Sequence, residues 1–339
     1  MQLLPRLDTR LHSRAAPQAA STGRLASIDQ FRGFAILAMV LGNYLIGVTY
    51  LPAWLKHSPD IGLTLMDLGA PWFIFAISLT VRLSARRRLA AGGWRHTLSH
   101  GFTRSMALVG IGSILGAGQI AFGLNPGGVN WGVLQAIGAA NLLTLLVIGL
   151  ACELRLALGL LLLWGYQFML DRFWLESVLN SPHGGIQGVL AWAAMMILGT
   201  VLADLFHGDG RGRDLYPWAA AVMLAVGIGL AVWVPVSKNR MSASYVLITL
   251  GISALLFLAF HLLTHRLNLH VPLLVACGRN PLLLYLIHQV LLGLLVLPAL
   301  PAWYAQAPPP LMVLQAAALL GAVAWIGREL DRQHIYFTL

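Results

Sequence analysis

Long apolar runs separated by short polar connections dominate this sequence. From residue 28 onward, about ten runs approach the ~20 residues that an α-helix needs to cross a bilayer. They lie at 28–51, 64–83, 103–123, 131–151, 154–170, 187–205, 215–235, 242–264, 281–300 and 311–329. The short alternating segments of an outer-membrane barrel do not occur. The pattern therefore predicts an all-α polytopic membrane protein with about ten transmembrane helices.

The composition supports this fold class and narrows the chemistry. Of the 339 residues 58% are hydrophobic and 10% are charged, whereas soluble domains have about 25% charged residues. Cys152 and Cys277 adjoin apolar segments and have no metal-ligand spacing, so we expect neither a disulfide framework nor a metal. No Walker, GxSxG, HExxH or CxxC motif is present, so a cofactor held by one of these is not expected.

The first 23 residues are polar and basic, and they lack the apolar stretch of roughly 7–15 residues that a signal peptide requires. We therefore divide the chain into a basic cytoplasmic tail, 1–23, and a transmembrane domain, 24–339. The lack of a signal peptide and the bare N-terminus favour a bacterial inner membrane.

The basic residues predict the orientation of the spans. If the N-terminus and the C-terminus are both cytoplasmic, 18 of the 22 lysines and arginines lie inside, in agreement with the positive-inside rule. The four left outside are Lys56, Arg172, Lys238 and Arg240. The net charge of +10 then marks a cytoplasmic face at which an anionic ligand could dock, and no nucleic-acid partner is expected.

A polar stripe follows one face of the first predicted span. Asp29, Arg32 and Asn43 are 3 and 11 residues apart, which places them on one helical face over about 21 Å of helix. Lipid cannot satisfy such groups, so the stripe must face protein or water. Either Asp29 and Arg32 form an ion pair while Asn43 bonds a neighbouring helix, or the stripe marks a route through the protein.

The segment KHSPDIGLTLMDLGAPWFIFAIS, residues 56–78, brings His57 and Asp67 next to a long apolar run. Ionisable groups at a membrane span are costly and indicate function. Asp67 could orient and charge the His57 imidazole as in a general base. Two other readings stay open: Asp67 could cap the following helix, and His57 could be an interfacial anchor.

Further polar residues adjoin later spans. Lys238 and Asn239 lie in an outer loop, where they either bind a polar acceptor or are solvated. Arg279 and Asn280 lie at the inner start of a helix that carries His288, which by itself is more typical of helix packing. A Gly112–Gly116 pair could serve helix packing or a homo-oligomer.

Five sequence blocks together resemble a known family. In order they are RLASIDQFRGFAILAMVLGNY, LKHSPDIGLTLMDLGAPWFIFAIS, WGVLQAIG, PVSKNRMSASYVL and GRNPLLLYLIHQV. Their order, from residue 24 to about 339, is similar to that of the heparan-alpha-glucosaminide N-acetyltransferase family and its bacterial relatives. That family belongs with a wider superfamily of transmembrane acyltransferases.

The resemblance implies an enzyme that takes an acyl group, usually acetyl, from cytosolic acyl-CoA and passes it to a carbohydrate amine or hydroxyl outside. It implies catalytic roles for His57, Asp67 and Asn43. We assign Lys238, Asn239 and His288 to the acceptor substrate. The residues predicted to bind acyl-CoA at the inner mouth are Asp29, Arg32, Arg82, Arg86, Arg279 and Asn280. The alternative is a transporter for a small anion or sugar, although no two related halves are visible.

Overall fold

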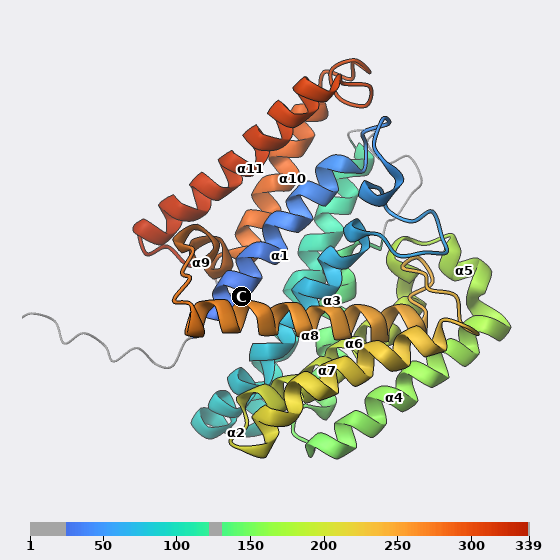
Figure 1. The fold of residues 1–339 in the computed structure, drawn as a ribbon, viewed down its shortest axis with the longest axis vertical. Coiled ribbons are helices and arrows are strands. Elements are labelled where there is room, and N and C mark those ends of the chain that lie inside the picture. The colour runs from blue at the N-terminus through green and yellow to red at the C-terminus, as the bar shows by residue number, and fades with distance from the viewer. Residues whose placement is uncertain (1–24, 122–130, 338–339) are drawn as a thin grey trace, which may run out of the picture.

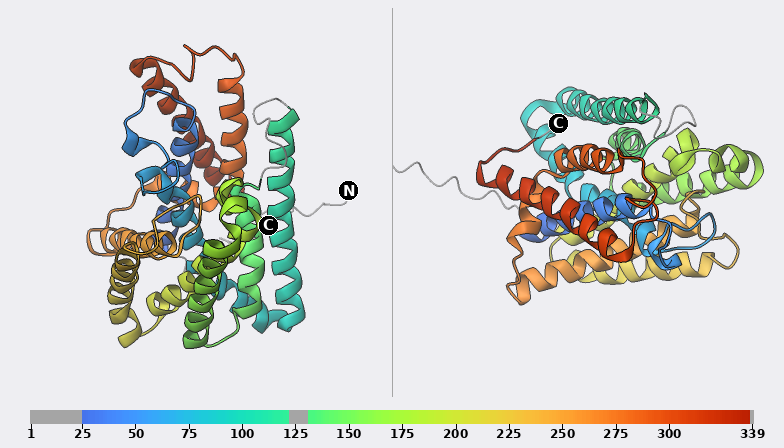
Figure 2. Two further views of the ribbon diagram at one scale, coloured as in Figure 1. Left: turned by 90° about the vertical axis from the view of Figure 1, so that its right-hand side faces the viewer. Right: turned by 90° about the horizontal axis from the view of Figure 1, so that it is seen from above.

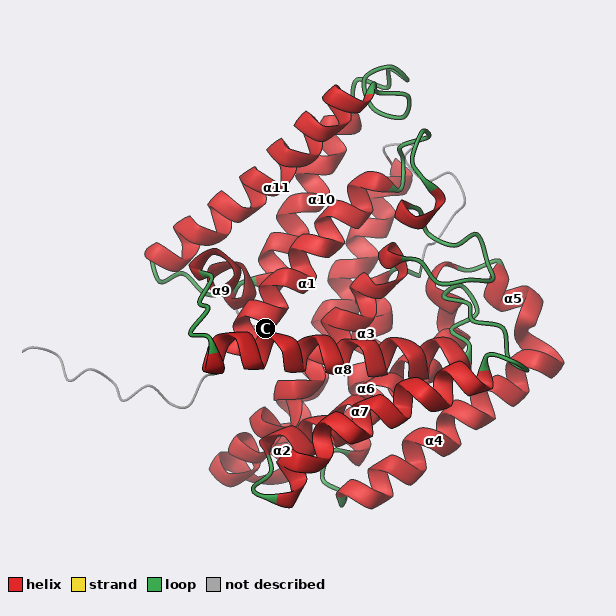
Figure 3. Ribbon diagram, viewed as in Figure 1, coloured by secondary structure: helices red, strands yellow, loops and turns green. Residues whose placement is uncertain are grey.

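The computed structural model describes residues 25–121 and 131–337, and helices form all the regular secondary structure in these two segments (Figures 1 and 3). The predicted basic tail, 1–23, lies outside the described residues. The helices are α1 (Ala26–Leu45), α2 (Gly69–Ala121), α3 (Val133–Val147), α4 (Cys152–Met169), α5 (Leu175–Leu179), α6 (Gly185–His207), α7 (Arg211–Leu230), α8 (Ala243–Arg266), α9 (Pro272–Arg279), α10 (Pro281–Val296) and α11 (Pro309–Arg332). The all-α prediction is confirmed.

The predicted connection between the second and third spans is helical. The parts of the predicted spans 64–83 and 103–123 that lie within Gly69–Ala121 belong to one element, α2, which is interrupted at Gly93, where φ is 71° and ψ is −172°. This left-handed conformation suits glycine, which lacks a Cβ. The arginine-rich segment between the spans therefore extends both helices instead of forming a loop.

A second sharp break separates α9 from α10. The two helices meet at 90° across Asn280, and Pro281 occupies the first turn of α10, where its missing N–H leaves no helical bond unmade. Within the described residues, five helices are long and apolar enough to span a bilayer, and the bent pair α9–α10 could make a sixth. The prediction of about ten spans stays a prediction.

Helix α1 lies at the centre of the bundle, with α2 and α3 on one side and α7 and α8 on the other (Figure 2). Its Phe31 ring packs edge-on against Phe75 and Phe257, at centroid distances of 6.2 and 5.6 Å. Gly33 lets α9 approach closely, because a Cβ there would lie 1.9 Å from the Leu274 carbonyl oxygen. The central position carries the polar face of α1 through the protein interior.

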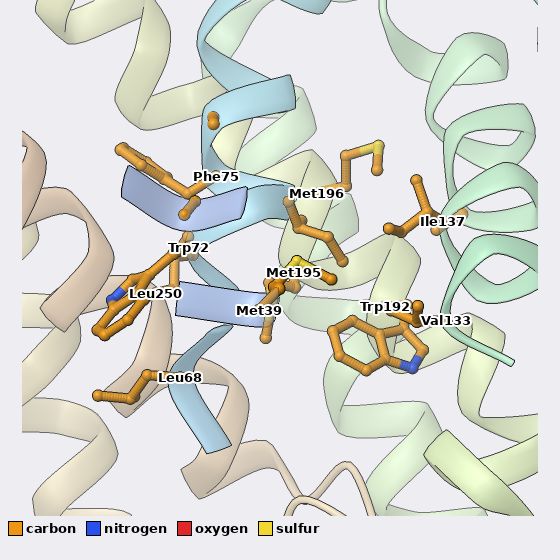
Figure 4. Packing of buried hydrophobic residues seen from close by; sticks show 14 of the residues in the cluster. Met39, Leu68, Trp72, Phe75, Val133, Ile137, Trp192, Met195, Met196 and Leu250 are labelled. Atoms are coloured by element: carbon orange, nitrogen blue, oxygen red, sulfur yellow. The ribbon is translucent and has the colours of Figure 1, made fainter. Parts of the chain in front are cut away.

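Buried apolar side chains fix α1 against α2, α3 and α6 (Figure 4). Met39 of α1 and Trp72 of α2 belong to this core together with Met195 and Met196 of α6. Helix α6 is buried on nearly all sides and carries almost no polar groups through its centre. This rigid packing holds the ends of α1 and α2, from which the candidate site is built.

Candidate active site

A histidine–aspartate pair stands in the segment that joins α1 to α2. His57 Nδ1 lies 2.7 Å from Asp67 Oδ1, so the structure shows the pairing that the sequence left open. The Asp67 side chain is fully buried, whereas that of His57 is 25% exposed. No protein atom in the described segments bonds His57 Nε2, so this nitrogen is available to a ligand.

The other oxygen of Asp67 organises the local backbone. Oδ2 accepts hydrogen bonds from the Thr64 amide and hydroxyl, each at 3.0 Å, and from the Ser58 amide at 3.3 Å. Thr64 and Asp67 form a capping box at the start of the 3₁₀ helix Leu65–Leu68. The two readings of Asp67 from the sequence are therefore compatible, since one oxygen caps the helix and the other holds the imidazole.

A second loop, between α7 and α8, is fastened onto the first. Arg240 pairs with Asp60, and the Asn239 amide donates to the Pro59 carbonyl at 2.6 Å. The Gly62 amide donates to the Val236 carbonyl at 2.7 Å. The hydrogen bond from Arg240 lowers the pKa of Asp60. We call this set of contacts the loop clamp.

Lys238 extends from the clamped loop to the histidine–aspartate pair. Its Nζ lies 3.0 Å from His57 Nδ1 and 3.8 Å from Asp67 Oδ1. The side chain is only 14% exposed. Burial lowers the pKa of Lys238, and the nearby Asp67 carboxylate partly opposes that shift.

Asn43 near the end of α1 contacts a histidine from α10. Its Nδ2 lies 2.9 Å from Nε2 of His288, which is fully buried. An amide nitrogen only donates, so His288 Nε2 accepts this bond. The second N–H of the Asn43 amide remains for another acceptor. His288 therefore holds the Asn43 amide in a fixed orientation.

These groups line one end of a cavity of about 730 Å³. Asn43, His57, Asp67 and Lys238 all contribute to its wall. From there the lining follows α1 back to Phe34 and then reaches α9; most of the remaining wall is apolar. A smaller cavity of about 290 Å³ adjoins it, and His57 lines both.

Sequence reasoning missed His183, which also lines the large cavity. It stands in the SPHGG turn before α6 with a positive φ of 55°, and its backbone carbonyl accepts a bond from Trp192. The signal was a histidine between a proline and two glycines. The orientation prediction placed this turn on the same side as His57 and Lys238, and the structure brings the three segments together.

The residues predicted to bind acyl-CoA do not gather around this cavity. Arg32 contacts Asp29 at 3.4 Å and the Gly278 carbonyl at 3.2 Å. In the sequence it precedes Phe34, which lines the far end of the cavity, by two residues. Arg82 pairs with Asp204, and Arg86 is exposed.

At the start of α10 the predicted acyl-CoA residues hold the C-terminal segment. Arg279 pairs with Asp331 at 2.7 Å. Asn280 donates to the Ile335 carbonyl and accepts from the Phe337 amide, each at 2.8 Å. The roles of these residues toward acyl-CoA stay predictions.

Asp204 also pairs with Arg155 of α4, a fully buried side chain that the sequence did not single out. Asn239, predicted to contact the acceptor, bonds the Pro59 carbonyl and does not line either cavity. Within the described residues, no group of three or more His, Cys, Asp or Glu side chains is arranged to hold a metal ion.

Residues 24–262 match the family model described as "Heparan-alpha-glucosaminide N-acetyltransferase, catalytic". The chain is 34% identical over 146 residues to the mouse heparan-alpha-glucosaminide N-acetyltransferase, covering 37% of this chain and 21% of the relative. It is 35% identical over 126 residues to the human protein, covering 34% and 17%. The matches thus span about a fifth of the length of these curated relatives. The chain is an integral membrane protein that belongs to the heparan-alpha-glucosaminide N-acetyltransferase catalytic family.

Proposed function

We propose that this protein transfers an acetyl group from cytosolic acetyl-CoA to a carbohydrate amine or hydroxyl on the outer side of a bacterial inner membrane. The observation that carries the proposal is the position of the His57–Asp67 pair at the end of a cavity that continues along α1. The family match favours a transferase over a transporter.

The large cavity supports a donor route from the inner side. Its lining follows α1 from Ile46 to Phe34, which corresponds to about 18 Å of helix. Arg32 lies just beyond Phe34, where its guanidinium bonds Asp29 and the Gly278 carbonyl; in this proposal it also meets a phosphate of the donor, which a guanidinium binds through its planar fork. In this proposal the pantetheine arm lies in the cavity with the thioester near Asn43 and His57.

His57 acts as the general base in the proposed reaction. With the Nδ1 proton held by Asp67, the Nε2 lone pair removes a proton from the acceptor amine or hydroxyl as that group attacks the thioester. Asp67 stabilises the imidazolium that forms. The C–S bond breaks, coenzyme A leaves as a thiolate, and that thiolate takes up the proton from His57 to become the thiol.

Asn43 supplies the electrophilic side of the site. The N–H that is not directed at His288 can donate to the oxyanion formed from the thioester carbonyl. Oxyanion donors of this kind lower a barrier by about 3–4 kcal/mol. His288 fixes the amide and is a positioning residue in this proposal.

The smaller cavity is assigned to the acceptor. It is lined by the end of α1 and the 47–56 loop, and it meets the large cavity at His57. This arrangement lets donor and acceptor approach one imidazole from two sides. The proposed topology, with about ten spans and both termini in the cytoplasm, places this cavity outside.

Replacement of His57 tests the proposal. The purified protein in liposomes would be supplied with acetyl-CoA on the inner side and a panel of amino sugars outside. We expect His57→Ala to lose at least 10²-fold in acetyl transfer, because a positioned base contributes 10²–10⁴. His270→Ala, at an exposed histidine, is the matched control. Full activity of His57→Ala would refute the assignment.

Binding of the donor is tested separately from catalysis. Acetyl-CoA should raise the thermal unfolding temperature of both wild type and His57→Ala, because a ligand that binds the folded state stabilises it. Neither acetyl phosphate nor ATP should produce the same shift. A shift with ATP but not with coenzyme A would contradict the proposed donor.

A further inference from the structure

The Nδ1 atom of His57 has two neighbours that compete for it. Asp67 Oδ1 lies 2.7 Å away and Lys238 Nζ lies 3.0 Å away. A ring nitrogen carries either a proton or a lone pair, and a lysine ammonium has only protons to donate. Nδ1 therefore cannot donate to the Asp67 carboxylate and accept from a Lys238 ammonium at the same time.

The two protonation states of Lys238 select different imidazole tautomers. When Lys238 is an ammonium that donates to Nδ1, the ring proton is on Nε2 and no lone pair faces the substrate. When Lys238 is a neutral amine, Nδ1 carries the proton and donates to Asp67, and Nε2 is free to act as a base. Passage from the first state to the second releases one proton from Lys238 to solvent and moves the ring proton from Nε2 to Nδ1.

We propose that Lys238 is a positioning residue that controls the tautomer of His57, so that transfer proceeds only when Lys238 is a neutral amine. This inference rests on the proposed function, in which His57 is the base. It replaces the sequence-based assignment of Lys238 to acceptor binding with a regulatory role in the same site.

The surroundings of Lys238 favour this role. The flanking residues of the loop are bonded to the first loop: Ser237 to Asp60, and Asn239 to Pro59. These bonds hold the backbone on both sides of Lys238 next to the first loop, so its side chain starts beside the histidine–aspartate pair. The titratable groups near it are His57, Asp67 and His183, which come from three separate segments. Burial lowers the pKa of Lys238, which brings its neutral form toward the working range of an enzyme.

Charge repulsion, like the choice of tautomer, makes the site more active when Lys238 is neutral. The imidazolium formed during catalysis is disfavoured by an ammonium 3.0 Å away, because like charges repel. Loss of the Lys238 proton removes that repulsion and leaves Asp67 as the charged neighbour. Both effects predict that acetyl transfer increases as pH rises through the titration of Lys238.

Two substitutions separate this role from others. Lys238→Met removes the competitor, so transfer should persist and the midpoint of the pH–kcat/KM profile should fall by about one pH unit or more. Lys238→Arg keeps a permanent positive charge, so its kcat/KM should fall at least tenfold at every pH and show no recovery at alkaline pH.

A role of Lys238 in binding the acceptor through its charge predicts the opposite order, with Lys238→Arg active and Lys238→Met impaired. A purely structural role predicts that both variants lose activity with an unchanged pH midpoint. Either result would overturn the proposal.

A spectroscopic measurement does not depend on transfer. In protein labelled with ¹⁵N-histidine, with the His57 signals identified by their loss in His57→Ala, the ring should pass from the Nε2–H to the Nδ1–H tautomer as pH rises. Lys238→Met should show Nδ1–H throughout, and Arg172→Met, at an exposed cation, should behave as wild type. An Nδ1–H tautomer at all pH values in wild type would refute the role of Lys238. Inactivity with every acceptor would count against the proposed function while leaving this measurement interpretable.

Discussion

The two polar regions of this protein differ in how their charges are satisfied. Around His57, charged and polar groups line two cavities and leave Nε2 without a protein partner in the described segments. At the other region, Arg155 of α4 and Arg82 of α2 share Asp204 of α6. A charge that is already paired inside the protein stabilises the fold, whereas an unpaired atom facing a cavity can act on a ligand. From this comparison we propose chemistry at the first region and a supporting role for the paired arginines.

The largest expected effect is on transfer at the His57 region. Asp67→Asn should lower kcat for acetyl transfer by about 10³-fold, because a neutral amide cannot stabilise the imidazolium formed by general-base catalysis. Steady-state kinetics in liposomes measures this, with Asp209→Asn, at an exposed carboxylate, as the control. The acetyl-CoA shift in unfolding temperature should remain. A fully active Asp67→Asn variant would show that Asp67 only caps the helix and does not take part in catalysis.

Stability should be affected most in the other region. Arg155→Met removes one of the two arginine partners of Asp204, which keeps Arg82, and leaves the buried Thr200 hydroxyl without the Arg155 bond, so we expect a loss of about 1–3 kcal/mol. Thermal unfolding in detergent should show the loss, with Arg172→Met unchanged. Activity per folded molecule should be kept. A stable but inactive Arg155→Met protein would contradict the assignment of catalysis to the His57 region.

A smaller effect on transfer is expected from the Asn43–His288 pair. Asn43→Ala should lower kcat by roughly 10²-fold through loss of an oxyanion donor, and His288→Ala should lower it less, because His288 only orients the amide. The double variant should resemble Asn43→Ala, since the two residues act as one unit. Additive losses would show that His288 contacts the substrate by itself.

The smallest effect concerns acid tolerance of the loop clamp. Arg240 lowers the pKa of Asp60, so the clamp contributes stability above the ordinary aspartate value of about 4 and loses it only as pH falls through the lower, folded value. With a hydroxyl acceptor, which does not titrate in this range, we expect the KM for acceptor to stay constant from pH 7 down to about pH 4. In Arg240→Met the rise in KM on acidification should begin at a higher pH than in wild type. A wild-type KM that already rises near pH 6 would exclude this clamp as the cause.

Local chemistry explains what could be predicted of the site. His57 and Asp67 are ten residues apart in one turn-rich segment, so a short chain brings them together. Polar positions on α1 were found from helical spacing, and Pro281 at a helix start follows from its missing N–H. Each of these inferences needs only neighbouring residues.

The inner arginines show where such reasoning ends. Arg82 meets an acid 122 positions away, and Arg279 meets one 52 positions away. A long side chain selects whichever carboxylate packing brings within reach, and spacing along the sequence does not encode that choice. Lys238 reaches His57 across 181 positions for the same reason.

By itself the sequence determined the membrane class and the helical content, because hydropathy fixes them, and it offered the histidine–aspartate pair as one of three readings. Only the tertiary structure decided that Lys238 lies beside His57, that His288 contacts Asn43 and that Arg82 and Arg279 pair with acids. These contacts depend on which helix ends converge, and the convergence is set by close packing of the whole bundle around α1.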